Sequence, residues 1–125
     1  MQLLDGDEAY LKEKGWDHQL HADGEGGGLI IKGFRLATGK YDHDVVDLLI
    51  CIPKGYNNAK LDNFYVDPAL RLKATGQYPQ AAEVFESHVG RQWQRFSRHM
   101  EVWRPGIDML KNFIVHACRE LQNNT

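Results

Sequence analysis

The sequence has little of several features that would place a chain in a functional class. Only two of its 125 residues are cysteines, Cys51 and Cys118, which predicts free thiols in a reducing cytoplasm and not a disulfide scaffold. A net charge of −2, without any run of Lys or Arg, argues against an electrostatic nucleic-acid binder. No apolar run approaches the length of a membrane span, and the N-terminus lacks the basic and apolar segments of a signal peptide. We therefore expect a cytoplasmic protein that binds neither nucleic acid nor membrane.

Patterns typical of metal and phosphate sites are also missing. The six histidines are dispersed along the chain: His18, His21, His43, His88, His99 and His116. Their spacing matches no known zinc motif, and two of them, three positions apart on a predicted strand, would point to opposite faces. The glycine-rich turn at 23–28 is not followed by the Lys-Ser/Thr that starts the helix of a phosphate-binding loop. The sequence therefore predicts no metal and no cofactor.

The chain contains enough apolar residues to form the core of one compact domain. Apolar residues make up 42% of the sequence, and the length is that of a single domain, which we expect to span residues 1–125. The patterns predict an α+β fold whose antiparallel meander has about four strands, at 16–21, 29–36, 45–52 and 64–66. A short helix is expected over 8–14, capped by Asp5 or Asp7 and ended by Gly15.

The strand at 45–52 has the most regular pattern. Its apolar residues recur at every second position: Val46, Leu48, Ile50 and Ile52. Period-two spacing predicts one apolar face, and it places Asp47, Leu49 and Cys51 together on the opposite face.

A long C-terminal helix is the clearest helical prediction. Its apolar stripe recurs at helical spacing: Ile107, Leu110, Phe113, Ile114, Ala117, Cys118 and Leu121. We expect Pro105 in the first turn, Asp108 near the N-terminal end of the helix dipole, and Cys118 hidden in the core. Upstream, Gly76 and Pro79 indicate a loop, and 81–85 is expected to form a short helix.

Several short segments resemble a ubiquitin-conjugating (E2) domain. Residues 45–56 are similar to its third strand and the turn that follows, with Pro53 and Tyr56 matching and Asn57 replacing a proline. Residues 61–68 are similar to the next strand and its His-Pro-Asn motif, of which only Pro68 remains. Trp103-Arg104-Pro105 resembles the Trp-x-Pro that precedes a helix after the active-site loop. The whole run from 33 to 108 is closer still to the bacterial group named E2/UBC family protein E.

The resemblance places Trp93 where these enzymes keep their catalytic cysteine. Residues 90–93 occupy the Gly-x-x-Cys position, ten residues before Trp103-Arg104-Pro105, within a segment at 90–103 that we expect to be a loop. The resemblance implies a ubiquitin-conjugating (UBC/RWD-like) fold and an E2-like role in a bacterial ubiquitin-like protein modification pathway. The implied partners are a ubiquitin-like protein and its activating enzyme, with a JAB-type peptidase among the neighbouring genes.

Without the cysteine, three functions remain open. The first is a non-catalytic adaptor, whose expected partner-binding residues are Trp93, Arg95, Arg98 and Trp103. The second is an atypical acyl carrier, whose candidate catalytic residues are His99, Ser97 and Cys51, since imidazole, hydroxyl and thiol groups can serve as base or nucleophile. The third is an unrelated α+β protein-interaction domain. Binding outranks catalysis because indole cannot attack a carbonyl.

Overall fold

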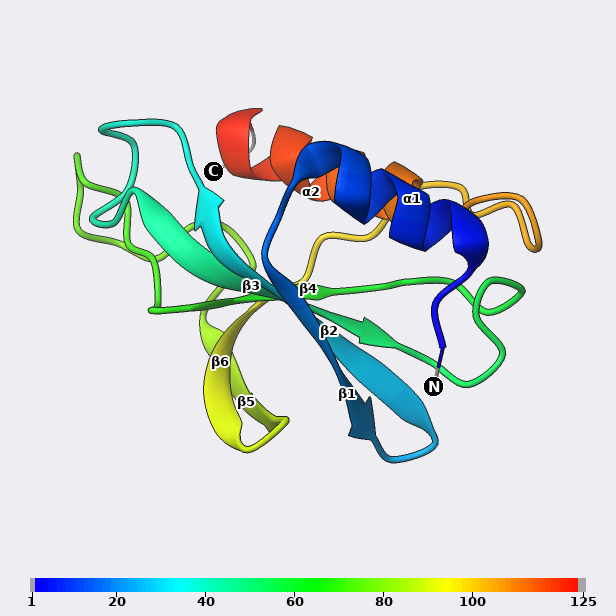
Figure 1. Ribbon diagram of the computed structural model, residues 1–125. Helices are drawn as coiled ribbons and strands as arrows, with labels where there is room; N and C mark the ends of the chain where they lie inside the picture. Colours follow the sequence, from blue (N-terminus) through cyan, green and yellow to red (C-terminus); the bar gives the residue numbers. More distant parts are fainter. Residues whose placement is uncertain (1, 124–125) are drawn as a thin grey trace.

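The computed structural model describes residues 2–123, and its main feature is a six-stranded antiparallel sheet with both helices on one face (Figure 1). The elements follow in the order α1 (Asp5–Lys14), β1 (His18–Asp23), β2 (Gly26–Arg35), β3 (Val45–Ile52), β4 (Phe64–Asp67), β5 (Val84–His88), β6 (Arg91–Phe96) and α2 (Leu110–Asn123). The strand order across the sheet is β1-β2-β3-β4-β6-β5. The α+β class is confirmed. The predicted domain ends, residues 1 and 125, lie outside the described residues.

The strand count of about four was wrong, because β5 and β6 add a hairpin beside β4. The segment expected as a helix at 81–85 contains the start of β5 instead. Ala81 has a left-handed backbone conformation (φ 57°), which a continuous right-handed helix does not accommodate. The segment at 90–103 is likewise only partly a loop, since β6 occupies its first half. The hairpin pairing of β5 with β6 is the tertiary contact that decides both points.

The predicted alternation in β3 is confirmed. Its four alternate apolar residues are buried in the core beneath the helices: Val46, Leu48, Ile50 and Ile52. Leu49 is buried on the opposite face with Ile30, Tyr65 and Trp93, and Cys51 packs against that second cluster. The central strand therefore separates two apolar clusters, as period-two geometry requires.

The C-terminal stripe is confirmed from Leu110 onward. The buried members are Leu110, Phe113, Ile114, Ala117 and Leu121. The predicted start was wrong: α2 begins at Leu110, and Pro105 and Asp108 lie in the preceding turn. Gly106 in that turn has a left-handed φ of 74°, and Ile107 is 62% exposed. Cys118 is half-buried at the edge of the core, not fully hidden.

The N-terminal helix α1 confirms the predicted helix and extends it by three residues. It begins at Asp5 and ends before Gly15, whose φ of 70° suits a glycine after a helix. The residue at the N-cap is Leu4, not Asp5 or Asp7. Asp7 lies in the first turn, and its buried carboxylate accepts hydrogen bonds from the backbone of Leu4 and Leu110. One carboxylate thereby satisfies the start of both helices.

The edge strand β1 begins two residues later than predicted, at His18. The expected turn at 23–28 is shorter than predicted, because β1 runs through Asp23 and β2 begins at Gly26. Trp16, which precedes β1, packs against Tyr10 and Phe34 and so belongs to the helix-covered core.

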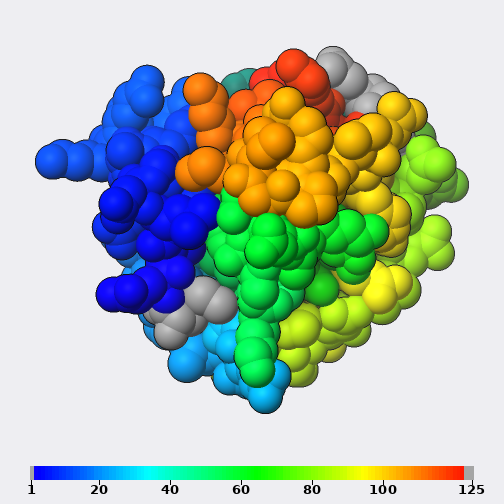
Figure 2. All heavy atoms as spheres, turned by 90° about the vertical axis from the view of Figure 1, so that its right-hand side faces the viewer, coloured from blue at the N-terminus to red at the C-terminus, as the bar shows by residue number. Residues whose placement is uncertain are grey.

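Two loops meet at one end of the sheet. Figure 2 shows the orange segment before α2 lying against the green segment after β3. Asn57 joins them, because its backbone carbonyl accepts hydrogen bonds from the Trp103 indole and the Gly106 amide. Within residues 2–123, neither helix is long and apolar enough to cross a bilayer.

Candidate functional site

Trp93 lies in the middle of β6 and is fully buried. Its indole N–H donates to the backbone carbonyl of His88 across the hairpin at 3.0 Å, and the Arg91 guanidinium lies 4.0 Å from the ring centre. The position where the resemblance places the family cysteine is therefore the packed centre of a hairpin.

The other three predicted partner-binding residues hold this part of the fold together. Arg95 donates to the Glu86 carboxylate at 2.7 Å. Arg98 is 7% exposed, and its guanidinium donates to the carbonyl of Gln80. Trp103 is half-buried and packs on the ring of Tyr56. Each has an intramolecular contact, so the surface open to a partner lies mainly around them.

Ser97 and His99 follow β6 on the way to α2. The backbone N–H of Ser97 donates to Ala81, and the His99 ring contacts the carboxylate of Asp62. No hydrogen bond among the described residues joins the Ser97 hydroxyl to the His99 ring. The structure thus brings His99 to a carboxylate from another loop and does not pair it with the serine.

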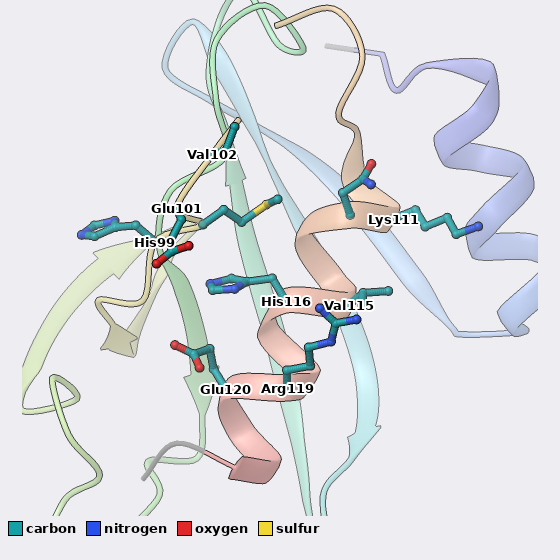
Figure 3. Close-up of a pocket in the computed structure, with 10 residues that line it drawn as sticks. His99, Glu101, Val102, Lys111, Val115, His116, Arg119 and Glu120 are labelled. Carbon is teal, nitrogen blue, oxygen red and sulfur yellow. The ribbon is translucent and has the colours of Figure 1, made fainter. Parts of the chain in front are cut away.

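An open groove of about 780 Å³ lies between residues 99–102 and α2 (Figure 3). Its lining combines apolar, cationic and acidic side chains: His99, Met100, Glu101, Val102, Lys111, Asn112, Val115, His116, Arg119 and Glu120. Val102 at its rim is 67% exposed. The His116 ring contacts the backbone carbonyl of Arg98 at 2.7 Å and fixes the wall of the groove.

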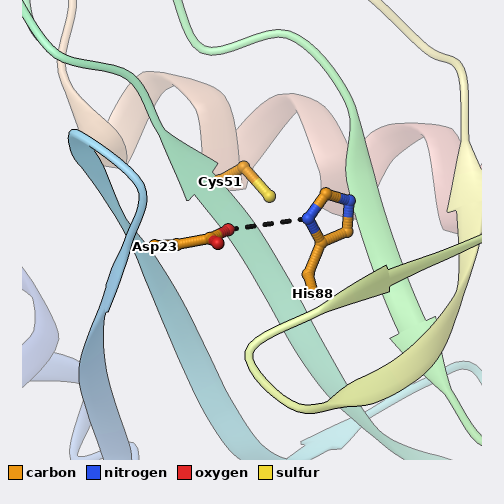
Figure 4. A group of neighbouring side chains, drawn as sticks. All are labelled: Asp23, Cys51 and His88. Carbon is orange, nitrogen blue, oxygen red and sulfur yellow. Dashed lines mark ion pairs between the residues drawn. The ribbon is translucent and has the colours of Figure 1, made fainter.

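A second hollow, of about 360 Å³, lies near the other predicted nucleophile, Cys51. Cys51 and His88 converge there with Asp23, as Figure 4 shows. The thiol, imidazole and carboxylate come from β3, β5 and β1, and one potential ligand atom from each lies within 4.8 Å of the others. Asp62 lines this hollow and also contacts His99, so the two hollows are neighbours.

The electrostatics around Cys51 oppose its ionisation. Burial, with the nearby carboxylates of Asp23 and Glu86, raises the pKa of the Cys51 thiol to about 12. Both nitrogens of the His88 ring face carboxylates: Nδ1 lies 3.5 Å from Asp23, and Nε2 lies 2.9 Å from Glu86. Burial and the two carboxylates therefore disfavour the thiolate that a catalytic cysteine requires.

A comparison with known protein families shows which family this chain belongs to. The match to the family described as prokaryotic E2 family E spans residues 3–124. The chain belongs to prokaryotic E2 family E. No curated protein and no solved structure matched it.

Sequence reasoning about this family E chain missed Asp23, Glu86 and His88. Glu86 and His88 lie two positions apart on β5, but no local spacing connects them to Asp23 on β1, which is not a neighbour of β5 in the sheet. The curl of the hairpin over the sheet brings them together. The local signals were the alternation in β3, which placed Cys51 on the face away from the helices, and the two-residue spacing of Glu86 and His88.

Proposed function

We propose that this family E protein is a non-catalytic binding component of a ubiquitin-like protein modification pathway. It holds the ubiquitin-like protein, alone or together with its activating enzyme, and forms no covalent intermediate. The observation that carries the proposal is the burial of Trp93, which the resemblance places at the position of the family nucleophile. A side chain without a reactive group, inside a packed hairpin, serves stability and not acyl transfer.

The remaining nucleophiles support the same conclusion. Cys51 is half-buried, and burial with two nearby carboxylates raises the pKa of its thiol. The pKa of the Cys118 thiol is also raised by burial. Ser97 lacks a hydrogen-bonded base among the described residues. An acyl carrier requires an accessible nucleophile that is activated, and none of these three groups meets both conditions.

The groove beside α2 is the surface we assign to the partner. It follows the segment that, by resemblance, lies beside the E2 active site, and it is the larger of the two hollows. Val102 and Val115 provide apolar contact area, while Lys111 and Arg119 provide positive charge on the helix. Glu101 and Glu120 also line the groove, so it carries charges of both signs. This combination suits an extended segment with apolar and mixed-charge side chains that crosses the helix, because apolar anchors give affinity and charges give orientation.

Binding measurements test this assignment. The probes are the ubiquitin-like protein and the activating enzyme that the proposal expects among the neighbouring genes, each titrated against the full chain by calorimetry. Val102→Asp should weaken binding about tenfold or more, equivalent to ~1.4 kcal/mol. Val84→Asp is the matched control, because Val84 is also exposed but begins β5, outside the groove. Unchanged affinity for Val102→Asp, or equal loss in both variants, would remove the groove from the proposal.

The acyl-carrier alternative is tested in the same reaction mixture. The chain is incubated with the activating enzyme, ATP and the ubiquitin-like protein, and the products are separated without reductant. We expect no covalent species. A reductant-sensitive adduct lost in Cys51→Ser would establish a thioester, and a base-sensitive adduct lost in Ser97→Ala would establish an ester. Either adduct would replace the adaptor function with catalysis.

A further inference from the structure

We infer that Asp23, Cys51 and His88 form a binding site for one thiophilic divalent metal ion of the zinc class. The site lies on the sheet face opposite the helices, under the β5–β6 hairpin (Figure 4). This inference is independent of the proposed function, because it concerns the chain alone and needs no partner.

The donor atoms already lie near coordinating positions. The Nδ1 atom of His88 is 3.5 Å from a carboxylate oxygen of Asp23, and the Cys51 sulfur completes a set within 4.8 Å. Bonds of 2.0–2.3 Å in a tetrahedral arrangement place two ligand atoms ~3.3–3.6 Å apart. The imidazole–carboxylate separation thus fits, and the sulfur requires a shift of at most ~1.5 Å.

Glu86 orients His88 through the ring nitrogen that does not face the site, as a carboxylate does for many metal-bound histidines. Its Oε1 lies 2.9 Å from Nε2 of His88, so the ring can carry its hydrogen there and present the lone pair of Nδ1 to Asp23 and Cys51. Arg95 and Tyr65 donate to the same carboxylate, at 2.7 and 3.1 Å, and hold it in place. An ordinary Asp23–His88 ion pair would not require a thiol or this second carboxylate.

The surroundings leave room for a further ligand. The three side chains border the 360 Å³ hollow, whose lining also includes Asp62 and Asn63. Three protein ligands with one open position are typical of zinc sites that bind water or a small ligand. One sulfur, one nitrogen and one oxygen donor favour zinc or cobalt over magnesium or calcium, which prefer oxygen alone.

Binding changes the protonation of one ligand. The divalent ion bonds to the sulfur as the Cys51 S–H bond breaks, and the proton passes to solvent. No oxidant or reductant is needed. The imidazole contributes its lone pair, and the carboxylate of Asp23 contributes one oxygen.

Metal titration of the isolated full chain tests the site. The protein is treated with a chelator, desalted under reducing conditions and given one equivalent of Co²⁺ or Zn²⁺. We expect one Zn²⁺ per chain to remain after gel filtration and Co²⁺ to produce a thiolate-to-cobalt charge-transfer band. Cys51→Ser should abolish the band, whereas Cys118→Ser, which removes the other thiol, should retain it.

Further variants separate ligands from bystanders. His88→Asn and Asp23→Asn should lower metal affinity, and His43→Gln, an exposed histidine in the β2–β3 connection, should leave it unchanged. Glu86→Gln should weaken affinity about 10- to 100-fold but keep the charge-transfer band, because it acts only through His88. Circular dichroism of each metal-free variant confirms that it is folded, and Cys51→Ala replaces Cys51→Ser if the latter is not.

Three results would overturn the inference. The wild-type chain could show no charge-transfer band, the band could persist in Cys51→Ser, or it could disappear in Cys118→Ser. The absence of a band in the wild type would mean that Asp23 and His88 form only an ion pair. A band that persists in Cys51→Ser or disappears in Cys118→Ser would place the metal at the other thiol. None of these results depends on whether the chain binds a ubiquitin-like protein.

Discussion

On one face of the sheet, two helices cover a large cluster of buried apolar side chains, whereas on the other face a hairpin covers four, Ile30, Leu49, Tyr65 and Trp93. The small cluster is bordered by charge. Arg91 contacts Asp47 and Asp67 at its rim. On its other side, the Glu86 network joins the hairpin to the neighbouring strand.

The two faces of the sheet therefore have different roles. Burial of apolar area is the main source of stability, so the helix face should carry most of the folding free energy. The hairpin face has fewer apolar contacts and more titratable groups near solvent. The four predictions below test that division, from the largest expected effect to the smallest.

Phe113→Ala should have the largest effect. The ring is fully buried between α2 and the sheet and lies edge-on to Phe64. Its removal leaves a cavity and should lower the free energy of unfolding by about 3–5 kcal/mol, measured by urea denaturation. Val115→Ala, on the groove side of the same helix, is the control and should cost much less. Similar losses in both variants would mean that the helix face is not the main core.

Trp93→Ala should act more locally. Trp93 supports a hairpin whose outer strand, β5, lies at the sheet edge and contains no fully buried residue. We expect amide exchange in β5 to accelerate about tenfold or more, equivalent to ~1.4 kcal/mol of local opening, relative to the change in β3 and α2. Hydrogen exchange read by NMR measures both. A uniform acceleration across all three elements would show one cooperative unit and remove the distinction between the faces.

The two faces also differed in how far the sequence predicted them. On the helix face, the alternation of β3 and the stripe from Leu110 to Leu121 identified the core correctly, because periodicity records which side of an element is buried. Three details differed: α2 begins later than predicted, α1 begins earlier, and Cys118 is half-buried at the edge of the core. Pro105 and Asp108 suit a first helical turn locally, but Gly106 adopts a left-handed conformation in a turn held against Asn57, which is a tertiary contact.

On the hairpin face, the sequence predicted little. Residues 81–85 have an acceptable helix composition, and their pairing with β6 depends on residues about ten positions away. The Asp23–Cys51–His88 cluster is more distant still, because its members come from strands that do not pair with one another. Spacing rules detect ligands on one helix or turn and miss sites assembled by the curl of a sheet.

Asp47→Asn should have a moderate, pH-dependent effect. Burial raises the pKa of Asp47, but the hydrogen bonds from Arg91 and Gly33 and the charge of Lys32 outweigh it, so the net pKa is lowered. A carboxyl with a lowered pKa stabilises the fold above its unfolded value of ~3.9, and this contribution is lost as the pH falls through the folded pKa.

The measurement is the difference in free energy of unfolding between wild type and Asp47→Asn. It should be about 1 kcal/mol at pH 7 for a partly buried ion pair, and it should shrink below about pH 4. Asp17→Asn, at an exposed position before β1, is the control and should show no such trend. A pH-independent difference would mean that Asp47 contributes by packing and not by its charge.

The smallest effect should be on the reactivity of the two thiols, with stability nearly unchanged. Burial raises the pKa of both, to about 12 for Cys51, where Asp23 and Glu86 add to it, and less for Cys118, where Lys14 opposes it. Only the thiolate reacts with iodoacetamide, although a thiolate of higher pKa is intrinsically more nucleophilic. At pH 8 Cys51 should therefore react about tenfold to a hundredfold more slowly than free cysteine, with Cys118 between them.

Mass spectrometry of chelator-treated Cys118→Ser and Cys51→Ser proteins gives each rate separately, and the rate of Cys51 should still be rising at about pH 10. A Cys51 that reacts as fast as free cysteine, with a plateau near neutral pH, would reveal an activated thiol on the hairpin face and would favour the acyl carrier over the adaptor.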